Sequence, residues 1–535
     1  MVRIMVALGV SLGLCCTILS ASQAAPASRW STDKLIVRFE HEGLRSVQSV
    51  RPQDLVPGIS LPDGGRLRSV RRFNADGMVV RLPRMVSSEE AWRLAERLAA
   101  QPGIASAQPD KRMYPALVPN DPDYLPGANA FVDPGQWHLF EDTAGIRMPA
   151  AWDRTTGSSD VVIAQLDTGI LGHRDLDPLG TRILPGYDFV SELDTANDGD
   201  GRDADPTDPG DWAEPGDVCY VGDPNNPELD HSSWHGLSVA GVMVAEANNG
   251  LDIAGIDFAA RLLPLRVLGT CGGLLSDVAD AIRWAVGLPV AGVPAVNPSP
   301  AKVINLSLSG AGACSPEEQL AIDAAVNAGA VVIVAAGNQG LDVADFSPAN
   351  CNNVITVGAV DRDGSVASYM NVGEEIDLSA PAGDGDGVSG EGILTLFNDG
   401  TTVPAQDILA YIQGTSFAAA QVSAVAALMW AVNDALDPGT IEELLRRTAR
   451  ARSFPDSSCN TLLCGEGVLD ADAALIGAAD PASVLPASND LGGGGGGGGG
   501  GCSVAGTVNR YDLSLLLALA ACGLLCSSRR VRPLF

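Results

Sequence analysis

Four short segments of the chain carry side chains whose types could perform acyl-transfer chemistry. Asp167 precedes Thr-Gly, His235 lies in Ser-Trp-His-Gly, Asn338 ends Ala-Ala-Gly-Asn, and Ser416 lies in Gly-Thr-Ser-Phe-Ala. Serine is a weak nucleophile at neutral pH, so it needs a base. The base needs a group that orients it, and the developing oxyanion needs hydrogen-bond donors. The four residues are the right types for these roles.

The same residues have other interpretations. Asp-Thr-Gly also surrounds the carboxylates of aspartic proteases, but that site needs a second copy, which the sequence lacks. His231 and His235 are four residues apart, as in zinc-protease helices, but Ser232 stands where the general-base glutamate would be. Interpretations without chemistry are a helix cap for Asp167, a core histidine for His235 and a turn residue for Asn338.

The elements that must position these side chains alternate between strands and helices from about residue 136. Continuous apolar runs, which are typical of parallel strands buried on both faces, occur at 161–164, 303–306, 331–334 and 354–357. We expect Ser276 to cap one helix, and Ser315 followed by Pro316 to begin another. The pattern predicts an α/β fold with a doubly wound, mostly parallel sheet, in which ligands bind at the carboxyl ends of strands.

A further helix is expected to begin near Ser416. The segment from Ser416 to Trp430 is apolar on every face, so a helix there must be buried. Ser416 would then lie on a rigid element, with its hydroxyl at the positively polarised N-terminus of the helix.

In chain order, the motifs Asp-Thr-Gly, His-Gly-x-x-Val-Ala-Gly, Ala-Ala-Gly-Asn and Gly-Thr-Ser-x-Ala resemble those of the subtilisin family of serine proteases. The resemblance covers roughly residues 136–478. It implies a subtilisin-like catalytic domain at 116–480, which hydrolyses peptide bonds of protein or peptide substrates through an acyl-enzyme. It also implies an Asp-His-Ser triad.

The resemblance assigns a role to each of the four residues. Asp167 would orient the imidazole of His235 and stabilise its charged form. His235 would act as general base and then as general acid, while Ser416 attacks the carbonyl carbon. The side chain of Asn338 and the backbone N–H of Ser416 would hold the oxyanion.

The segment Ser307, Leu308 and Ser309 matches the family's strand that pairs with an extended substrate backbone. The chain departs from the family pattern at Leu237, Ser238, Ser309 and the pair Ala420-Gln421. None of these departures removes a triad group, although Leu237 can alter the packing behind His235 and Ser309 adds a side chain beside the substrate. The alternative function is a catalytically impaired, protease-like surface binding protein.

Residues 25–115 contain strand and helix signals of a small, separate α+β domain, which resembles the family's inhibitor-like propeptide. The resemblance implies a self-processing precursor that is cut near residues 113–120 and is inhibited by its own propeptide. A permanent binding domain is the alternative for this module.

The segment 194–211 is rich in aspartate with interleaved glycine. Hard oxygen ligands on a flexible loop suit Ca²⁺, and the segment resembles that of the disulfide-bonded extracellular subtilases of Gram-negative bacteria. We expect a structural calcium ion and no organic cofactor. The candidate ligands are Asp198, Asp200, Asp203, Asp208 and Asp211. A solvated acidic loop is the alternative.

Six of the 11 cysteines lie between the two terminal segments: Cys219, Cys271, Cys314, Cys351, Cys459 and Cys464. An even number in an exported chain suggests three disulfides, for which about 15 pairings are possible. Metal ligation is the competing use, but the six contain no Cys-x-x-Cys pair. We favour pairing in sequence order.

The two ends of the chain have the composition of targeting segments. In residues 1–24, a basic residue, an apolar run and small residues follow one another, as in a secretory signal peptide. Residues 481–501 are rich in Pro, Ala and Gly, which is typical of a flexible linker. Residues 502–535 carry a short apolar run and then arginines, which resembles the C-terminal sorting signals of Gram-negative bacteria. A tail without function is the alternative.

The net charge of the chain is −31 at neutral pH, with 34 basic and 65 acidic side chains. A surface that is this acidic repels phosphate backbones, so the composition argues against nucleic-acid binding. We expect an exported, extracellular or cell-surface monomer that contacts a membrane only through its C-terminal tail, before that tail is processed.

Overall fold

The computed structural model describes residues 31–39, 68–73, 77–101, 103–110, 118–126, 134–177, 180–220, 230–293, 295–384, 390–450, 460–461 and 463–485. The predicted signal peptide and sorting segment lie outside the described residues, as do most of the predicted linker and the part of the predicted cleavage region at 113–117. These predictions therefore stay predictions.

Residues 31–110 contain a four-stranded antiparallel sheet and one helix. The strands are β1 (Ser31–Phe39), β2 (Arg68–Phe73), β3 (Gly77–Ser87) and β4 (Ile104–Pro109), in the order β2-β3-β1-β4. Helix α3 (Ser88–Ala99) packs against β1, β3 and β4. Apolar side chains such as Leu35, Val80 and Leu98 form a separate core there, so this part of the chain has the α+β character expected of a small module.

The centre of the following part is a seven-stranded sheet in which every pairing is parallel. Its strands, in spatial order, are β13 (Leu378–Pro381), β12 (Ile355–Val360), β10 (Val331–Ala335), β8 (Val303–Leu306), β5 (Val162–Asp167), β7 (Arg261–Arg266) and β6 (Tyr187–Asp188). Nearly every side chain in these strands is buried, which explains their continuous apolar runs. The predicted α/β class and parallel sheet are confirmed.

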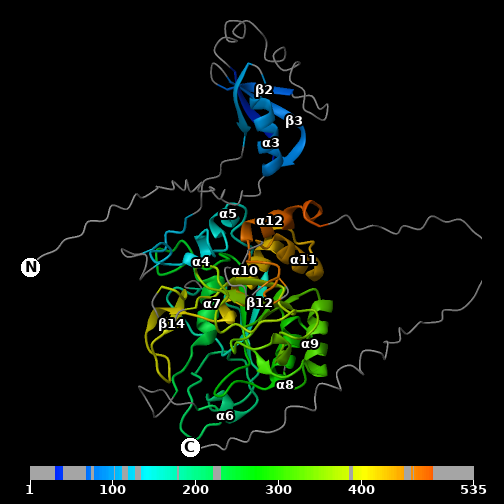
Figure 1. The fold of residues 1–535 in the computed structure, drawn as a ribbon. Helices are drawn as coiled ribbons and strands as arrows, with labels where there is room; N and C mark the ends of the chain where they lie inside the picture. The colour runs from blue at the N-terminus through cyan, green and yellow to red at the C-terminus, as the bar shows by residue number, and fades with distance from the viewer. Residues whose placement is uncertain are drawn as a thin grey trace, which may run out of the picture. The chain divides into compact units, whose positions relative to one another are not determined.

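Helices cover both faces of this sheet (Figure 1). On one face, α10 (Thr415–Val432) packs against β8, β10 and β12, with α7 (His235–Val244) beside it. On the other face, α8 (Leu275–Ala285) contacts β5 and β7, and α9 (Pro316–Asn327) contacts β10. This is the doubly wound arrangement, in which chemistry is expected at the carboxyl ends of the strands.

Shorter elements complete the described part of the chain. The helices are α4 (Trp137–Phe140), α5 (Met148–Trp152), α6 (Leu193–Ala196), α11 (Pro438–Thr448), α12 (Ala471–Ala479), η2 (Val343–Asp345) and η3 (Pro481–Ser483). The remaining strands form two antiparallel pairs, β9 (Gly310–Ala311) with β11 (Phe346–Ser347) and β14 (Ile393–Asn398) with β15 (Asp407–Ile412). The Ser347–Pro348 peptide bond is cis.

The predicted helix starts at Ser276 and Ser315 have different outcomes. Ser315 caps α9 as expected, since its hydroxyl accepts from the Glu318 N–H while the Glu318 carboxylate accepts from the Ser315 N–H. The prediction for Ser276 was wrong. Helix α8 begins at Leu275, and its N-cap residue Leu274 makes no side-chain capping bond, so Ser276 lies inside the first turn.

Helix α10 is the one helix, among the described residues, whose length and apolar composition would allow it to cross a membrane. Its 18-residue window is 89% buried inside the protein. The helix is therefore the core helix of the fold, as the all-round apolar sequence after Ser416 predicts.

His138 in α4 is a buried titratable group. Its side chain is fully buried, and neither ring nitrogen has a hydrogen-bond partner in the part of the chain that the structure describes. Burial lowers the pKa of His138 to about 3, because a charged imidazolium loses its hydration in this position. His138 is therefore neutral in the folded chain but takes up a proton in the unfolded chain below about pH 6.5.

We predict that this difference weakens the fold in acid. The folded-state pKa is depressed, so the stabilisation is complete above pH 6.5 and is lost progressively as the pH falls towards 3, by up to about 1.4 kcal/mol per pH unit. A His138→Leu variant should show a shallower loss over this range. The measurement is the free energy of unfolding against pH, with Ser416→Ala in both proteins to prevent self-digestion. Parallel curves for the two proteins would contradict the prediction.

Candidate active site

Asp167 and His235 form a hydrogen-bonded pair at the carboxyl end of β5. Asp167 ends the strand and is 1% exposed, and its Oδ1 accepts from the Thr168 N–H at 2.8 Å and from His235 Nδ1 at 2.7 Å. Burial lowers the pKa of His235, but the charge of Asp167 and this hydrogen bond outweigh it, so the pKa lies above its ordinary value. With Nδ1 bound to the carboxylate, Nε2 is the ring nitrogen left for proton transfer.

Two glycines let the segments that carry this pair approach each other. A Cβ atom on Gly236 would lie 2.0 Å from the carbonyl oxygen of Gly169. Gly169 itself has a φ of +114°, a conformation that favours glycine. The turn into α7 is made by Trp234, whose φ is 48° and whose buried indole donates to the carbonyl of Gly400 at 2.7 Å. The start of α7 is thereby held against the end of β5.

Ser416 lies in the first turn of the buried helix α10 and is 6% exposed. Its Oγ donates to the carbonyl of Ser307 at 3.3 Å, while the Ser307 hydroxyl donates to the carbonyl of Ser416 at 2.9 Å. The ring of Phe417 lies 5.9 Å from the ring of His235, so the starts of α7 and α10 meet.

Within the described residues, the single hydrogen bond of the Ser416 hydroxyl goes to Ser307 and not to His235. The structure therefore brings serine and histidine into one site without forming their hydrogen bond. Rotation of the Ser416 side chain is needed to turn Oγ towards His235. Such bonds are often loose without a substrate.

Asn338 lies just beyond β10, with its side chain exposed. Its amide oxygen accepts from the N–H of Thr415 at 3.0 Å and from the Thr415 hydroxyl at 2.8 Å. The Nδ2 group has no acceptor among the described residues, and it lies 3.4 Å from the position that a Cβ on Gly414 would take. Thr415 thus orients the amide so that its N–H donors stay free next to the backbone that precedes Ser416.

A cleft with a volume of about 350 Å³ adjoins this group. Its lining residues are Thr168, Asp211, Ser233, His235, Leu268, Gly269, Cys271, Gly272 and Ser307. Of the predicted substrate-pairing segment, Ser307 is buried, whereas Leu308 and Ser309 are half-buried and follow the carboxyl end of β8. The four predicted catalytic residues and this segment therefore come to the same edge of the sheet.

Two hydroxyls to which the sequence motifs gave no role connect the site to the acidic segment, residues 194–211. Thr168 Oγ1 accepts from the N–H of Gly236 at 3.0 Å and donates to Asp208 at 2.6 Å. Ser233 Oγ accepts from the N–H of His235 at 3.3 Å and donates to Asp211 at 2.7 Å. Each hydroxyl gives its proton to a carboxylate and its lone pair to an N–H at the start of α7. Their positions beside Asp167 and His235 in the sequence could have indicated that these two hydroxyls belong to the site.

The five candidate calcium ligands do not converge on one point. Asp198 forms an ion pair with the buried Arg266, Asp208 binds Thr168, and Asp211 binds Ser233. The carboxylates of Asp200 and Asp203 join no group of three or more possible ligands among the described residues. The residues thus do not fit the predicted five-carboxylate site, although one or two of them with backbone carbonyls would suit Ca²⁺.

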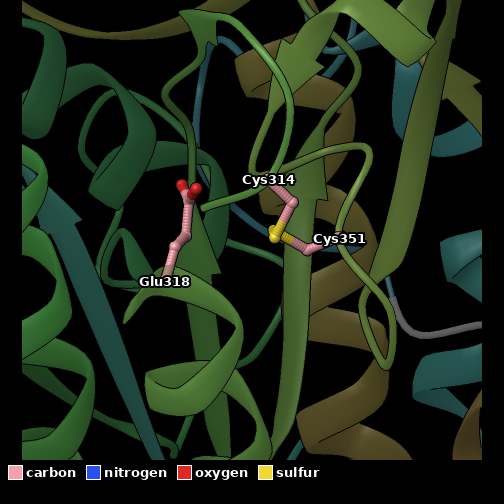
Figure 2. Close-up of side chains that lie close together, drawn as sticks. All are labelled: Cys314, Glu318 and Cys351. Carbon is pink, nitrogen blue, oxygen red and sulfur yellow. A yellow bond between two sulfur atoms is a disulfide. The ribbon is translucent and has the colours of Figure 1, made fainter. Parts of the chain in front are cut away.

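The described residues contain one group of three possible metal ligands, Cys314, Glu318 and Cys351. Figure 2 shows that the two cysteines are joined as a disulfide, with Glu318 beside them. The carboxylate of Glu318 accepts from the N–H of Ser315 in the cap of α9. Because the sulfurs are bonded to each other and the carboxylate serves the cap, this group is structural.

The disulfides of the described part pair Cys219 with Cys271 and Cys314 with Cys351, with Cα–Cα distances of 5.3 and 5.1 Å. Both follow the order of the sequence. Cys464 is also disulfide-bonded, and Cys459 lies outside the described residues. The pairing of Cys459 with Cys464 stays a prediction.

Three of the residues that depart from the expected motifs, Leu237, Ser238 and Gln421, are buried in the core. Leu237 is fully buried, and the Ser238 hydroxyl donates to the carbonyl of Leu396 at 2.9 Å. Gln421 is fully buried, and its amide donates to the carbonyl of Pro381. Each substitution is accommodated by apolar packing or by a hydrogen bond, and none of these three side chains lines the cleft.

The site has the features of a serine-type endopeptidase. These are a serine, a histidine held by a buried carboxylate, and a free amide, all at the carboxyl edge of a parallel sheet. A family model described as the subtilase family matches residues 158–468. This match and the relatives below show that the chain belongs to the subtilase family.

Several known proteins are similar to the chain. An extracellular protease of Xanthomonas campestris pv. campestris is 44% identical over 413 residues, which cover 77% of this chain and 66% of that protein. An extracellular basic protease of Dichelobacter nodosus is 36% identical over 451 residues, which cover 83% of this chain and 70% of that protein. The chain thus spans about two thirds of the length of these relatives.

A solved structure is also similar. It is described as proteases from Pseudoalteromonas arctica PAMC 21717, and it matches with a TM-score of 0.60 and 45% identity. The match covers 68% of this chain and 100% of that one.

We predict that Thr168→Val destabilises the chain by about 1–3 kcal/mol, because it leaves the N–H of Gly236 without its acceptor and the buried Oδ2 of Asp208 without its donor, while Asp208 Oδ1 keeps its bond from the Gly210 N–H. Burial raises the pKa of Asp208 to about 7, and the Thr168 hydroxyl opposes that rise by stabilising the charged form. The loss should therefore be larger at pH 8.5 than at pH 5.5. Unfolding free energies at both pH values test this, again with Ser416→Ala. Thr168→Ser keeps the hydroxyl and should lose less, whereas equal losses for both variants would contradict the prediction.

Proposed function

We propose that the chain is an exported serine endopeptidase that hydrolyses peptide bonds through an acyl-enzyme. The observation that carries the proposal is the buried Asp167–His235 pair, which lies beside the start of the helix that presents Ser416. The names of the two relatives, extracellular protease and extracellular basic protease, support both the activity and the export of this chain.

His235 is the general base in this mechanism. Asp167 holds Nδ1 and so leaves Nε2 free to take the proton of Ser416. Ser416 then attacks the carbonyl carbon of the substrate, and the imidazolium returns the proton to the leaving amine. Because the pKa of His235 lies above its ordinary value, the acid limb of the pH profile should lie above about pH 6.5.

Asn338 is the proposed donor to the oxyanion. Its amide oxygen is fixed by Thr415, so the Nδ2 donors are oriented before the substrate arrives. Preorganised donors of this kind stabilise developing negative charge without reorganisation. The N–H of Ser416, in the first turn of α10, is the proposed second donor.

We further propose that residues 25–115 are the propeptide of a self-processing precursor, and that residues 502–535 are a sorting segment that is the chain's sole membrane contact. The separate small core of the N-terminal module supports the first part. No nucleic acid takes part, and the working form is a monomer.

The decisive variant is Ser416→Ala. A fluorophosphonate probe should label the wild-type chain and leave Ser416→Ala unlabelled, and the variant should accumulate as the uncut precursor. Loss of Ser416 or His235 should lower kcat by about 10⁶, and loss of Asp167 by about 10⁴. Loss of Asn338 should cost about 3 kcal/mol of barrier stabilisation. A correctly folded chain that takes up no probe would support the alternative of a protease-like binding protein.

We propose that the acidic segment, residues 194–211, binds a calcium ion. The five predicted carboxylates are not proposed as its ligand set. The motivation is the density of carboxylates between residues 194 and 211. EDTA should lower the melting temperature of Ser416→Ala, and added calcium should restore it, because an ion that binds only the folded chain stabilises it. An unchanged melting temperature in EDTA and in excess calcium would remove calcium from the proposal.

A further inference from the structure

Among the described residues, the cleft beside His235 is lined by one carboxylate and by no lysine or arginine side chain. Asp211 supplies the carboxylate, and the remaining lining residues are neutral apart from His235 itself. Asp211 is half-buried, and it forms no ion pair within the described residues. The cleft therefore presents an uncompensated negative charge close to the proposed base.

The carboxylate of Asp211 is held firmly but is not saturated. Oδ1 accepts from the N–H of Ser233 at 2.6 Å, and Oδ2 accepts from the Ser233 hydroxyl at 2.7 Å. A carboxylate has about four lone-pair sites, so roughly two remain for a ligand. Arg266 is fully buried, and its guanidinium pairs with Asp188 and Asp198, so it does not neutralise Asp211.

The rest of the cleft suits an aliphatic stem. Leu268 supplies an apolar wall, and Cys271 brings a disulfide to the same surface. Gly269 and Gly272 exchange two backbone hydrogen bonds of 2.9 Å, and a Cβ atom on Gly272 would meet nothing within 4 Å. The cleft thus has a rigid lining with open space above Gly272.

We propose that Asp211 recognises a lysine or arginine side chain of the substrate, on the amino-terminal side of the cut. The methylenes of such a side chain would lie on Leu268 and the disulfide, and its cation would meet the free lone pairs of Asp211. The volume of about 350 Å³ accommodates one long side chain. The net charge of −31 also favours the approach of basic peptides. This inference rests on the proposed endopeptidase function.

A competing role for Asp211 is to hold Ser233 and so to position His235. Two variants separate these roles. Asp211→Asn removes the charge but keeps an oxygen that accepts from the Ser233 N–H. Ser233→Ala removes the hydroxyl relay to His235 but keeps the charge of Asp211.

The experiment measures kcat/KM on fluorogenic peptides that carry Lys, Arg, Gln or Leu, one at a time, at each of four positions before the cut. All assays use the mature, self-processed chain in one calcium-containing buffer. At one position, the wild type should cleave the Lys or Arg peptide at least about tenfold faster than the Gln peptide, which corresponds to about 1.4 kcal/mol. High salt should reduce this preference, since part of the charge is exposed.

Asp211→Asn should bring the Lys-to-Gln ratio at that position close to one, because cleavage of the Lys and Arg peptides should fall by about tenfold more than cleavage of the Gln and Leu peptides. Ser233→Ala should lower kcat for all peptides alike and keep the ratio. Asp205→Asn removes an exposed carboxylate of the same segment that does not line the cleft, and it should leave the ratio unchanged.

Two outcomes would overturn the inference: no position prefers a basic residue, or Asp211→Asn lowers cleavage of all peptides equally. The second outcome would assign Asp211 to positioning alone. A chain that cleaves no peptide and takes up no fluorophosphonate would instead refute the proposed function, so the two failures can be told apart.

Discussion

The hydrogen bond between Asp167 and His235 is the interaction on which the rest of the site depends. Asp167 is almost fully buried, and its Oδ2 has no partner among the described residues. Its hydrogen bonds within the described residues are therefore the two at Oδ1, from Thr168 and His235, and these offset the cost of burying the carboxylate. The same bond keeps the imidazole in one tautomer and raises its pKa, which are the conditions for a base near neutral pH.

Close backbone approach makes that bond possible. The carboxyl end of β5 and the start of α7 touch where Gly169 faces Gly236, and a side chain at Gly236 would collide with the carbonyl of Gly169. The N–H groups at the start of α7 would be unsatisfied at such a junction. The hydroxyls of Thr168 and Ser233 accept from two of them. The same contacts therefore satisfy the backbone at the start of α7 and hold His235 in the site.

The acidic segment gives the site its electrostatic character. Its carboxylates are distributed among distinct partners rather than gathered at one point. Asp198 forms an ion pair with the buried Arg266 at the end of β7, and Asp208 binds Thr168 in the interior. Asp211 faces the cleft while it supports Ser233. Asp211 thus supports the segment that carries His235 and also lines the cleft. Through Asp211, the fold of the acidic segment is linked to the proposed choice of substrate.

The sequence by itself determined the α/β class, the parallel strands and the residue types of the site. Buried strands, the helix start at Ser315-Pro316 and the four motifs are each recognisable from residue types over a few neighbouring positions. It misplaced the cap at Ser276, where Leu274 precedes the helix, since a serine near a helix start leaves the boundary undefined. Tertiary structure decided which carboxylate serves which hydroxyl. Thr168 and Asp208 are 40 positions apart, and Asp167 and His235 are 68 apart. The packing of β5 against α7 brings Asp167 to His235, and the course of the segment 194–211 brings Asp208 to Thr168. Neither contact follows from local spacing.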